Sequence, residues 1–182
     1  MPLMQSNGMP LGTPAPPFSL LNVNGETLSL ESFSDAEVLV IVFTCNHCPY
    51  AIASEDRLIE LQQDYGDKGV RFVAINPNDA VGYPADSFDA MKVRAQEKQF
   101  NFPYLYDESQ EVARAYDAAC TPDLFVFDRD RKLIYNGRID DNWQEPDKVT
   151  RRDLRAVLDA ALGGGAVDFD HVASMGCSIK WK

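Results

Sequence analysis

Cys45 and Cys48 form a Cys-x-x-Cys pair, which is the feature of this 182-residue chain with the clearest chemistry. The pair follows an apolar segment directly, at a point where we expect a strand to turn into a helix. Two intervening residues allow the side chains to close into a disulfide and reopen with little movement of the backbone. The alternative is that both cysteines are small buried hydrophobic residues, as single cysteines often are. Their spacing and position favour a redox couple.

Cys45 is the expected nucleophile of this couple. The N-terminus of a helix presents unpaired N–H groups and the positive end of its dipole, and both favour a thiolate. His47 lies between the cysteines, and a protonated imidazole beside Cys45 would lower the pKa of that thiol further. We therefore expect Cys45 at the helix mouth, open to a partner and with a low pKa. Cys48 would act second, resolving the mixed disulfide.

Apolar patterns around the cysteines predict a strand and a helix that hold them. Residues 38–43 are all aliphatic or aromatic, which is typical of a strand buried on both faces of a sheet. The helix that follows has Leu58, Leu61 and Tyr65 on one face, and Gly66 is placed to end it. The cysteines therefore belong to a strand-to-helix junction.

The rest of the chain alternates strands and helices without repeats. Residues 1–17 form an extended, proline-rich lead-in, and Asn24-Gly25 predicts a hairpin. Further strands are expected at 70–75, 102–106, 124–127 and 133–135, and helices at 87–100, 109–116 (capped by Ser109) and 154–162. A tail, 166–182, follows the glycine run. We expect one α/β domain, 1–182, whose mixed central sheet has helices on both faces.

Composition narrows the setting and the partners. Seventeen basic and 28 acidic residues give a net charge of -11, which argues against nucleic acid or an anionic membrane as partner. Residues 1–17 have no cationic segment followed by an apolar core, and we find no apolar stretch long enough to span a bilayer. We therefore expect a cytoplasmic protein. In that compartment four cysteines are better explained by redox or catalytic thiols than by structural disulfides.

Further motifs extend the pattern over nearly the whole chain. They are Ala15-Pro16-Pro17-Phe18, Phe102-Pro103-x-Leu105-x-Asp107, Thr121-Pro122 before an apolar strand, and Gly137 after the next strand. Together with the cysteine pair, these motifs resemble the thioredoxin-like superfamily. The closer resemblance is to its redoxin branch, which includes peroxiredoxins of the AhpC/TSA type and the TlpA and ResA type of thiol-disulfide proteins. The resemblance implies a thioredoxin fold with an N-terminal hairpin extension, and no cofactor or metal.

The resemblance also implies a role for Thr121 and Pro122, as a cis-proline opposite the cysteines. A cis peptide would leave the backbone of Thr121 free to pair with an extended substrate. The chain departs from typical thioredoxins at Thr44, where they have an aromatic residue, and in having no acidic residue in 38–43. A buried carboxylate that moves protons for the second cysteine is therefore missing there, and we expect His47 or a water to replace it.

A thiol-disulfide oxidoreductase of thiol redox or antioxidant metabolism is the predicted function. Its partners would be protein or small-molecule disulfides and a thiol reductant. A peroxiredoxin-like peroxidase is the alternative, because Cys48-Pro49 matches the Cys-Pro of peroxiredoxins, and Arg138 is a candidate to hold the peroxide. Against it, Thr44 lies four residues before Cys48, whereas peroxiredoxins place their threonine three residues ahead.

Two other cysteines and a metal site remain open. Cys120, just before Thr121, is either a third thiol near the dithiol or a small buried residue. Cys177 lies in an apolar tail that we expect to dock, where it either resolves a disulfide or only packs. A non-enzymatic alternative is zinc binding by the four cysteines, or by three of them with His47, although only one close pair exists.

Overall fold

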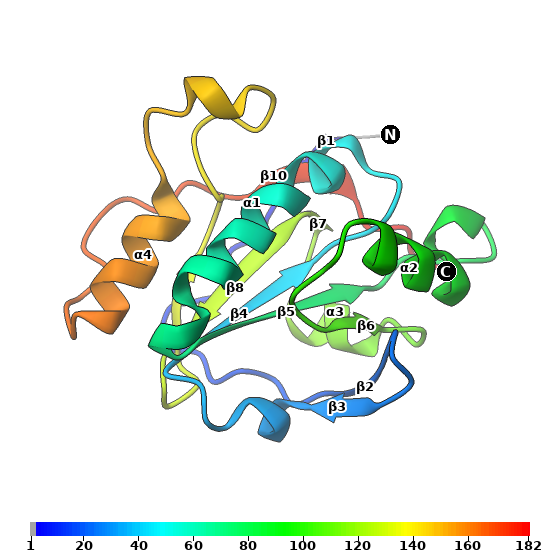
Figure 1. Ribbon diagram of the computed structural model, residues 1–182, viewed down its shortest axis with the longest axis horizontal. Coiled ribbons are helices and arrows are strands. Elements are labelled where there is room, and N and C mark those ends of the chain that lie inside the picture. Colours follow the sequence, from blue (N-terminus) through cyan, green and yellow to red (C-terminus); the bar gives the residue numbers. More distant parts are fainter. Residues whose placement is uncertain (1–2) are drawn as a thin grey trace.

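A seven-stranded mixed sheet forms the centre of the computed structural model, which describes residues 3–182 (Figure 1). The strand order is β3-β2-β6-β5-β4-β8-β9. Strand β4 runs parallel to β5, and β5 to β6, while the other neighbours are antiparallel. The bounds are β2 (Ser19–Asn22), β3 (Thr27–Ser29), β4 (Val38–Phe43), β5 (Val70–Asn76), β6 (Tyr104–Tyr106), β8 (Asp123–Phe127) and β9 (Leu133–Asn136). The mixed sheet and the hairpin at Asn24-Gly25 confirm the prediction.

Strand β4 lies between β5 and β8, which explains why the sequence of this strand is apolar throughout. All of its residues are buried, because helices cover one face of the sheet and a helix with the lead-in covers the other. Val42 stands opposite Ala74 of β5, and Phe43 stands opposite Asp123 of β8. The strand ends at Phe43, so the next residues emerge at the edge of the sheet where parallel strands end.

Helices cover both faces of the sheet, as predicted. Side chains of α1 (Pro49–Tyr65), α2 (Phe88–Glu97) and α4 (Asp153–Leu162) pack with Val38, Val40 and Val42 on one face. The intervening residues of β4 point to the other face, where α3 (Glu111–Ala115) and the lead-in pack on them. Short 3-10 helices occur at Leu30–Phe33, Gly66–Lys68, Pro84–Asp86 and Pro146–Lys148.

The cap of α3 differs from the prediction. Its N-cap is Gln110, with φ 66°, rather than Ser109. Ser109 still satisfies one free amide, because its hydroxyl oxygen accepts a hydrogen bond from the N–H of Glu111 at 3.2 Å. The predicted start was therefore one residue early.

A second, three-stranded sheet joins the two ends of the chain. Its order is β1 (Leu3–Gln5), β10 (Met175–Ser178) and β7 (Cys120–Thr121), with antiparallel pairing throughout. Figure 1 shows the red C-terminal strand β10 beside the blue β1. The expected docking of the tail is therefore confirmed. Strand β1, in contrast, was not predicted, because its residues are all exposed and form a strand only through pairing with β10.

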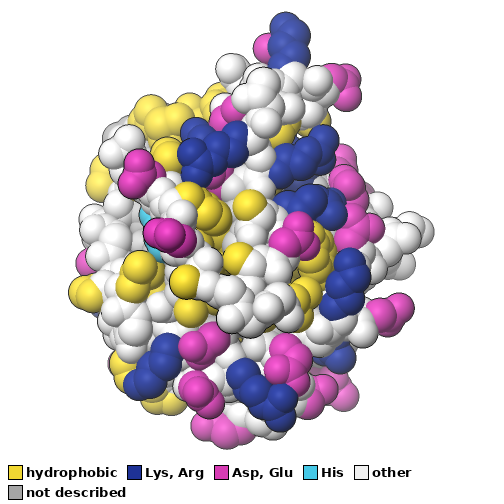
Figure 2. Space-filling view, turned by 90° about the vertical axis from the view of Figure 1, so that its left-hand side faces the viewer, with side chains coloured by type: hydrophobic (Ala, Val, Ile, Leu, Met, Phe, Trp, Pro, Cys, Tyr) yellow, Lys and Arg dark blue, Asp and Glu magenta, His cyan; other side chains and the backbone are white. Residues whose placement is uncertain are grey.

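Charges of both signs alternate on the face of the molecule that carries α4 (Figure 2). Arg155 pairs there with Asp64 at 2.8 Å and with Glu60 at 3.3 Å. Exposed pairs of this kind stabilise a fold by roughly 0–1 kcal/mol each. Within residues 3–182, none of the helices is both long enough and apolar enough to cross a membrane.

Gly176 allows β10 to approach β7, and its replacement by alanine tests this packing. A Cβ at residue 176 would lie 2.0 Å from the carbonyl oxygen of Thr121, which is backbone and cannot move aside easily. We expect Gly176→Ala to lower the free energy of unfolding by about 1–3 kcal/mol and to speed hydrogen exchange of the β10 amides. Gly165→Ala is the control, because its Cβ would meet Ala160 at an ordinary 3.6 Å. Unchanged exchange in Gly176→Ala would contradict the observed docking of β10.

Candidate active site

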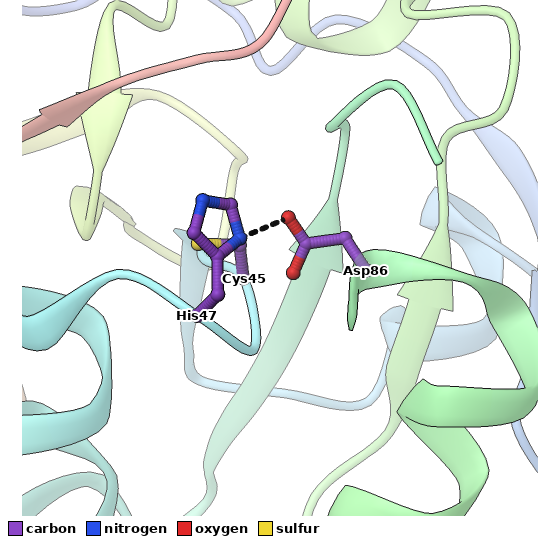
Figure 3. A group of neighbouring side chains, drawn as sticks. All are labelled: Cys45, His47 and Asp86. Atoms are coloured by element: carbon purple, nitrogen blue, oxygen red, sulfur yellow. Dashed lines mark ion pairs between the residues drawn. The ribbon is translucent and has the colours of Figure 1, made fainter. Parts of the chain in front are cut away.

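Cys45 and Cys48 lie between the end of β4 and the start of α1, and both are buried. Cys45 is 2% exposed and Cys48 is 0% exposed. Helix α1 begins at Pro49, so Cys48 is its N-cap residue and Cys45 precedes the helix. The expectation that Cys45 stands open to a partner at the helix mouth is therefore wrong. The imidazole of His47 lies over Cys45 instead (Figure 3).

Thr121 contacts both sulfurs. The Cys48 thiol donates a hydrogen bond to the Thr121 carbonyl oxygen at 3.1 Å, and the Cys45 Sγ lies 3.4 Å from the Thr121 hydroxyl oxygen. The peptide bond between Thr121 and Pro122 is cis, as the family resemblance predicted. Residues from three elements, β4, α1 and β7, thus meet at the two sulfurs.

The backbone edge of Thr121 is occupied. Strand β10 pairs with β7, and Cys177 stands directly opposite Thr121 in the register. The expectation that this edge is free for an extended substrate is wrong, because the C-terminal tail forms the neighbouring strand itself. Cys177 also packs with Cys45, Cys48 and Ala51 in one buried cluster.

The two thiols of the pair have opposite acidities. The pKa of Cys48 is lowered to about 4, chiefly because the Cys45 thiol donates a hydrogen bond to its sulfur, with further donation from Cys177 and from the backbone of Ala51. Burial opposes this shift. The pKa of Cys45 is raised by the same hydrogen bond, by burial and by the charge of Asp86. These directions are opposite to the low pKa expected for Cys45, and they favour the thiolate at Cys48.

Asp86 is the residue that changes the role of His47. The Nδ1 of His47 lies 2.6 Å from the Oδ2 of Asp86, and the imidazole stacks on Tyr83 with ring centroids 5.4 Å apart. Asp86 is fully buried and accepts hydrogen bonds at 2.8 Å from the backbone N–H of Asn46 and from the side chain of Asn78. A carboxylate beside the imidazole offsets the positive charge that was expected to favour a Cys45 thiolate.

Cys45, His47 and Asp86 bring three different ligand types together (Figure 3). The Sγ, a ring nitrogen and a carboxylate oxygen lie within 4.8 Å of one another. Sulfur, imidazole nitrogen and carboxylate oxygen are all ligands that zinc accepts in proteins. The sets considered in the sequence were four cysteines, or three of them with His47, and this cluster shares only Cys45 and His47 with them.

The remaining predicted residues surround the dithiol. Thr44 is buried, and its N–H donates to the Ile75 carbonyl at 2.8 Å, extending the β4–β5 ladder. Pro49 occupies the first position of α1, where its missing N–H costs nothing. Cys120 is fully buried, and its thiol is 3.5 Å from the Pro122 carbonyl oxygen. Burial raises the pKa of Cys120, so this thiol stays protonated.

Sequence reasoning missed two buried carboxylates, Asp86 and Asp123. Asp123 directly follows Pro122 in β8, and it accepts hydrogen bonds from the backbone of Ala119 at 3.1 Å and from the side chain of Asn136 at 3.3 Å. Burial raises the pKa of Asp123 to about 6. The carboxylate that is absent from β4 is thus present in the neighbouring strand. The sequence did contain a clue, since Asp123 is an acidic residue at the start of an otherwise apolar strand.

A hollow beside Pro122 contains the arginine that was considered for peroxide binding. Tyr50 and Trp143, whose ring centroids are 3.9 Å apart, line it together with Arg138. The Nε of Arg138 donates to Asp153 at 2.8 Å, so a carboxylate already pairs with this guanidinium. A peroxide-binding role for Arg138 stays a prediction.

The match to a family model decides the classification, because the Redoxin model covers residues 10–158. The chain belongs to the Redoxin family. An uncharacterised conserved protein from Geobacillus kaustophilus is 52% identical, with a TM-score of 0.96 over 100% of this chain and 97% of that one. Among curated proteins no match was found. The Redoxin match ends before β10, whereas the likeness to the Geobacillus protein includes the tail.

Two further structures show that this Redoxin chain has a thioredoxin-like fold. The thioredoxin domain of a thiol-disulfide oxidoreductase from Bacteroides vulgatus is 17% identical, with a TM-score of 0.62 over 71% of this chain and 89% of that one. A protein from Chlorobium tepidum with the provisional name thiol:disulfide interchange protein is 26% identical, with a TM-score of 0.67 over 86% of this chain and 100% of that one. The predicted fold class is therefore confirmed.

The order in which the thiols ionise can be measured directly. In the reduced protein we expect thiolate absorbance to appear as the pH rises through about 4, and to be lost in Cys48→Ser. Asp86→Asn removes a negative charge while keeping the shape of the side chain, so the pKa of Cys45 should fall by roughly 1. Alkylation rates of each cysteine against pH, measured by mass spectrometry, report both values.

The exposed Asp89 on α2 supplies the control for this charge effect. Asp89→Asn should leave both cysteines unchanged. An ionisation of Cys45 before Cys48 would overturn the assignment of the thiolate.

Proposed function

We propose that this protein is a thiol-disulfide oxidoreductase of cytoplasmic thiol redox or antioxidant metabolism, in which Cys45 and Cys48 alternate between dithiol and disulfide. The observation that carries the proposal is the packing of both sulfurs in one buried cluster at the start of α1, where each contacts Thr121. Membership of the Redoxin family supports it, as does the 26% identity to a protein provisionally named for thiol:disulfide interchange.

Cys48 is the proposed first nucleophile; because it is 0% exposed, an external disulfide can reach it only after the side chains that cover it move aside. Its thiolate attacks one sulfur of a protein or small-molecule disulfide, forms a mixed disulfide and releases the other sulfur as a thiolate. Cys45 then loses its proton and attacks the Cys48 sulfur, which breaks the mixed disulfide and releases the second substrate thiolate. The substrate disulfide has gained two electrons and the protein holds a Cys45–Cys48 disulfide. An external thiol reductant returns it to the dithiol. This order is the reverse of the one expected from the sequence.

His47 and Asp86 are proposed to assist the second step. Cys45 must lose a proton although burial and the charge of Asp86 raise its pKa. An imidazole beside the sulfur can accept this proton, and a carboxylate at 2.6 Å from Nδ1 stabilises the imidazolium that results. Asp86 therefore has two effects. Its charge raises the pKa of Cys45 in the resting dithiol, and its contact with His47 favours transfer of the Cys45 proton to the imidazole in the second step.

Trapping of intermediates tests the exchange mechanism. With a chromogenic small disulfide, Cys45→Ser/Cys177→Ser should accumulate a mixed disulfide on Cys48, because both neighbouring thiols that could resolve it are absent, while Cys48→Ser should lose at least about 100-fold in rate. Intact mass and peptide mapping identify the adduct. Cys120→Ser is the matched control and should neither trap an adduct nor abolish turnover. An adduct on Cys45 in Cys48→Ser, formed at the wild-type rate, would contradict the proposed order.

A peroxidase is a second candidate, favoured by the low pKa of Cys48 and by Pro49 after it. A peroxide would oxidise the Cys48 thiolate to a sulfenic acid and leave as water or an alcohol, and Cys45 would resolve the sulfenic acid with release of water. The same Cys45→Ser/Cys177→Ser protein separates the two activities. Rapid sulfenic acid formation at Cys48 with peroxide, and no mixed disulfide with the small disulfide, would replace the exchange proposal by the peroxidase.

Zinc binding is a non-enzymatic candidate, and the convergence of Cys45, His47 and Asp86 favours it. The exchange proposal predicts substoichiometric zinc in protein purified under reducing conditions, because a bound ion would block the Cys45 sulfur. Elemental analysis measures the metal content. One zinc per chain, lost in both His47→Ala and Asp86→Asn, would instead support a metal site.

A further inference from the structure

Strand β10 occupies the position beside the cysteines at which an extended peptide would pair with Thr121. Its Cys177 stands opposite Thr121, and its other edge pairs with β1, where Leu3 stands opposite Cys177. Gly176 is fitted to this place, because even a Cβ there would collide with the Thr121 carbonyl oxygen at 2.0 Å. The tail therefore binds the site as a peptide would, through backbone pairing and close contact.

Cys177 packs beside the dithiol. It is 5% exposed and lies in one buried cluster with Cys45, Cys48 and Ala51. Burial raises the pKa of Cys177 to about 12, so its sulfur is protonated in the resting protein. Cys48 thus has two cysteines in its cluster, and either one is a candidate partner for a disulfide.

The tail is held firmly on both sides of Cys177. Before it, the Ser174 hydroxyl donates to the Gly137 carbonyl oxygen at 2.7 Å. After it, the Lys180 carbonyl oxygen accepts a hydrogen bond from the buried Gln110 side chain at 2.8 Å, and the Lys180 N–H donates to Asn78 at 2.9 Å. Cys177 is thus presented to Cys48 at a high effective concentration, which favours an intramolecular reaction over one with a free thiol.

Cys120 provides an internal comparison. It is as deeply buried as the dithiol, and its backbone belongs to β7, yet its thiol is directed to the carbonyl oxygens of Pro122 at 3.5 Å and Ser174 at 3.9 Å. These contacts are to backbone oxygens and not to sulfur. A cysteine can therefore be buried near the site without packing on Cys48. Cys177 packs in the cluster that contains Cys48, whereas Cys120 does not belong to that cluster.

We propose that Cys177 is a third redox cysteine and that β10 serves as an internal substrate. The thiol of Cys177 replaces Cys45 as the disulfide partner of Cys48. In the exchange, the Cys177 sulfur attacks Cys48 in the Cys45–Cys48 disulfide. The bond from Cys48 to Cys45 breaks, a bond from Cys48 to Cys177 forms, and the proton of Cys177 passes to Cys45. The oxidation state of the protein is unchanged, so no additional oxidant is needed. This inference rests on the proposed function, because the exchange begins from the Cys45–Cys48 disulfide.

Disulfide mapping of the full chain tests the inference. Reduced Cys45→Ser is treated with diamide, quenched in acid, alkylated and digested. We expect a Cys48–Cys177 linkage and a corresponding loss of free thiols. Cys45→Ser/Cys120→Ser should keep this linkage, and Cys45→Ser/Cys177→Ser should lose it completely. Wild-type protein oxidised in the same way should contain both Cys45–Cys48 and Cys48–Cys177 linkages.

The outcomes separate this inference from the proposed function. A Cys45–Cys48 linkage in wild type, with no Cys48–Cys177 linkage in wild type or in Cys45→Ser, would overturn the role of Cys177 and leave the exchange couple intact. A Cys48–Cys120 linkage in Cys45→Ser would also overturn it. Absence of the Cys45–Cys48 linkage from oxidised wild type would instead overturn the proposed couple. The wild-type measurement keeps the test decisive if Cys45→Ser is poorly folded, which circular dichroism would show.

Discussion

Thr121 is the residue around which the site is arranged: its carbonyl oxygen lies 3.1 Å from the Cys48 sulfur and accepts a hydrogen bond from it while Cys48 is protonated. This contact joins the start of α1 to β7, and the hydroxyl of the same threonine lies 3.4 Å from Cys45. The opposite side of Thr121 pairs with Cys177. One residue thus contacts the Cys-x-x-Cys pair and also pairs with Cys177 from the C-terminal end of the chain. The cis peptide bond that follows carries the chain from β7 into β8 of the central sheet.

Charge around the sulfurs decides which thiol is reactive. Hydrogen-bond donation from the Cys45 and Cys177 thiols and from the backbone N–H of Ala51 lowers the pKa of Cys48, although burial opposes the thiolate. Asp86 has the opposite effect on Cys45, and it also holds His47 beside that sulfur. The site therefore keeps one thiolate and one protonated thiol side by side. This is the state that dithiol chemistry requires, with a nucleophile for the first step and a proton donor that becomes the second nucleophile.

Much of the fold follows from local sequence patterns. The bounds of β4 match the prediction, because burial on both faces gives an uninterrupted apolar run. Helix α1 ends just before Gly66, as predicted, but it begins only at Pro49, after the cysteines that were expected in its first turn. Strand β1 has no such pattern, since all three of its residues are exposed. It exists because β10 offers a free edge, and β10 in turn is set by its pairing with β7. Pairing between distant segments leaves little trace in the local pattern of either one.

The sequence by itself determined the chemistry that is available at this site: a Cys-x-x-Cys pair at a strand-to-helix junction and a Thr121-Pro122 motif beside an apolar strand. Only the tertiary structure decided how that chemistry is divided among the residues. Asp86 pairs with His47 from the 3-10 helix Pro84–Asp86, and β10 brings Cys177 into the cluster of Cys48. The physical reason is that acidity and reactivity depend on burial and on charges within a few ångströms of the sulfur. Residues that are distant in the chain supply both, so spacing along the chain alone could not assign the thiolate.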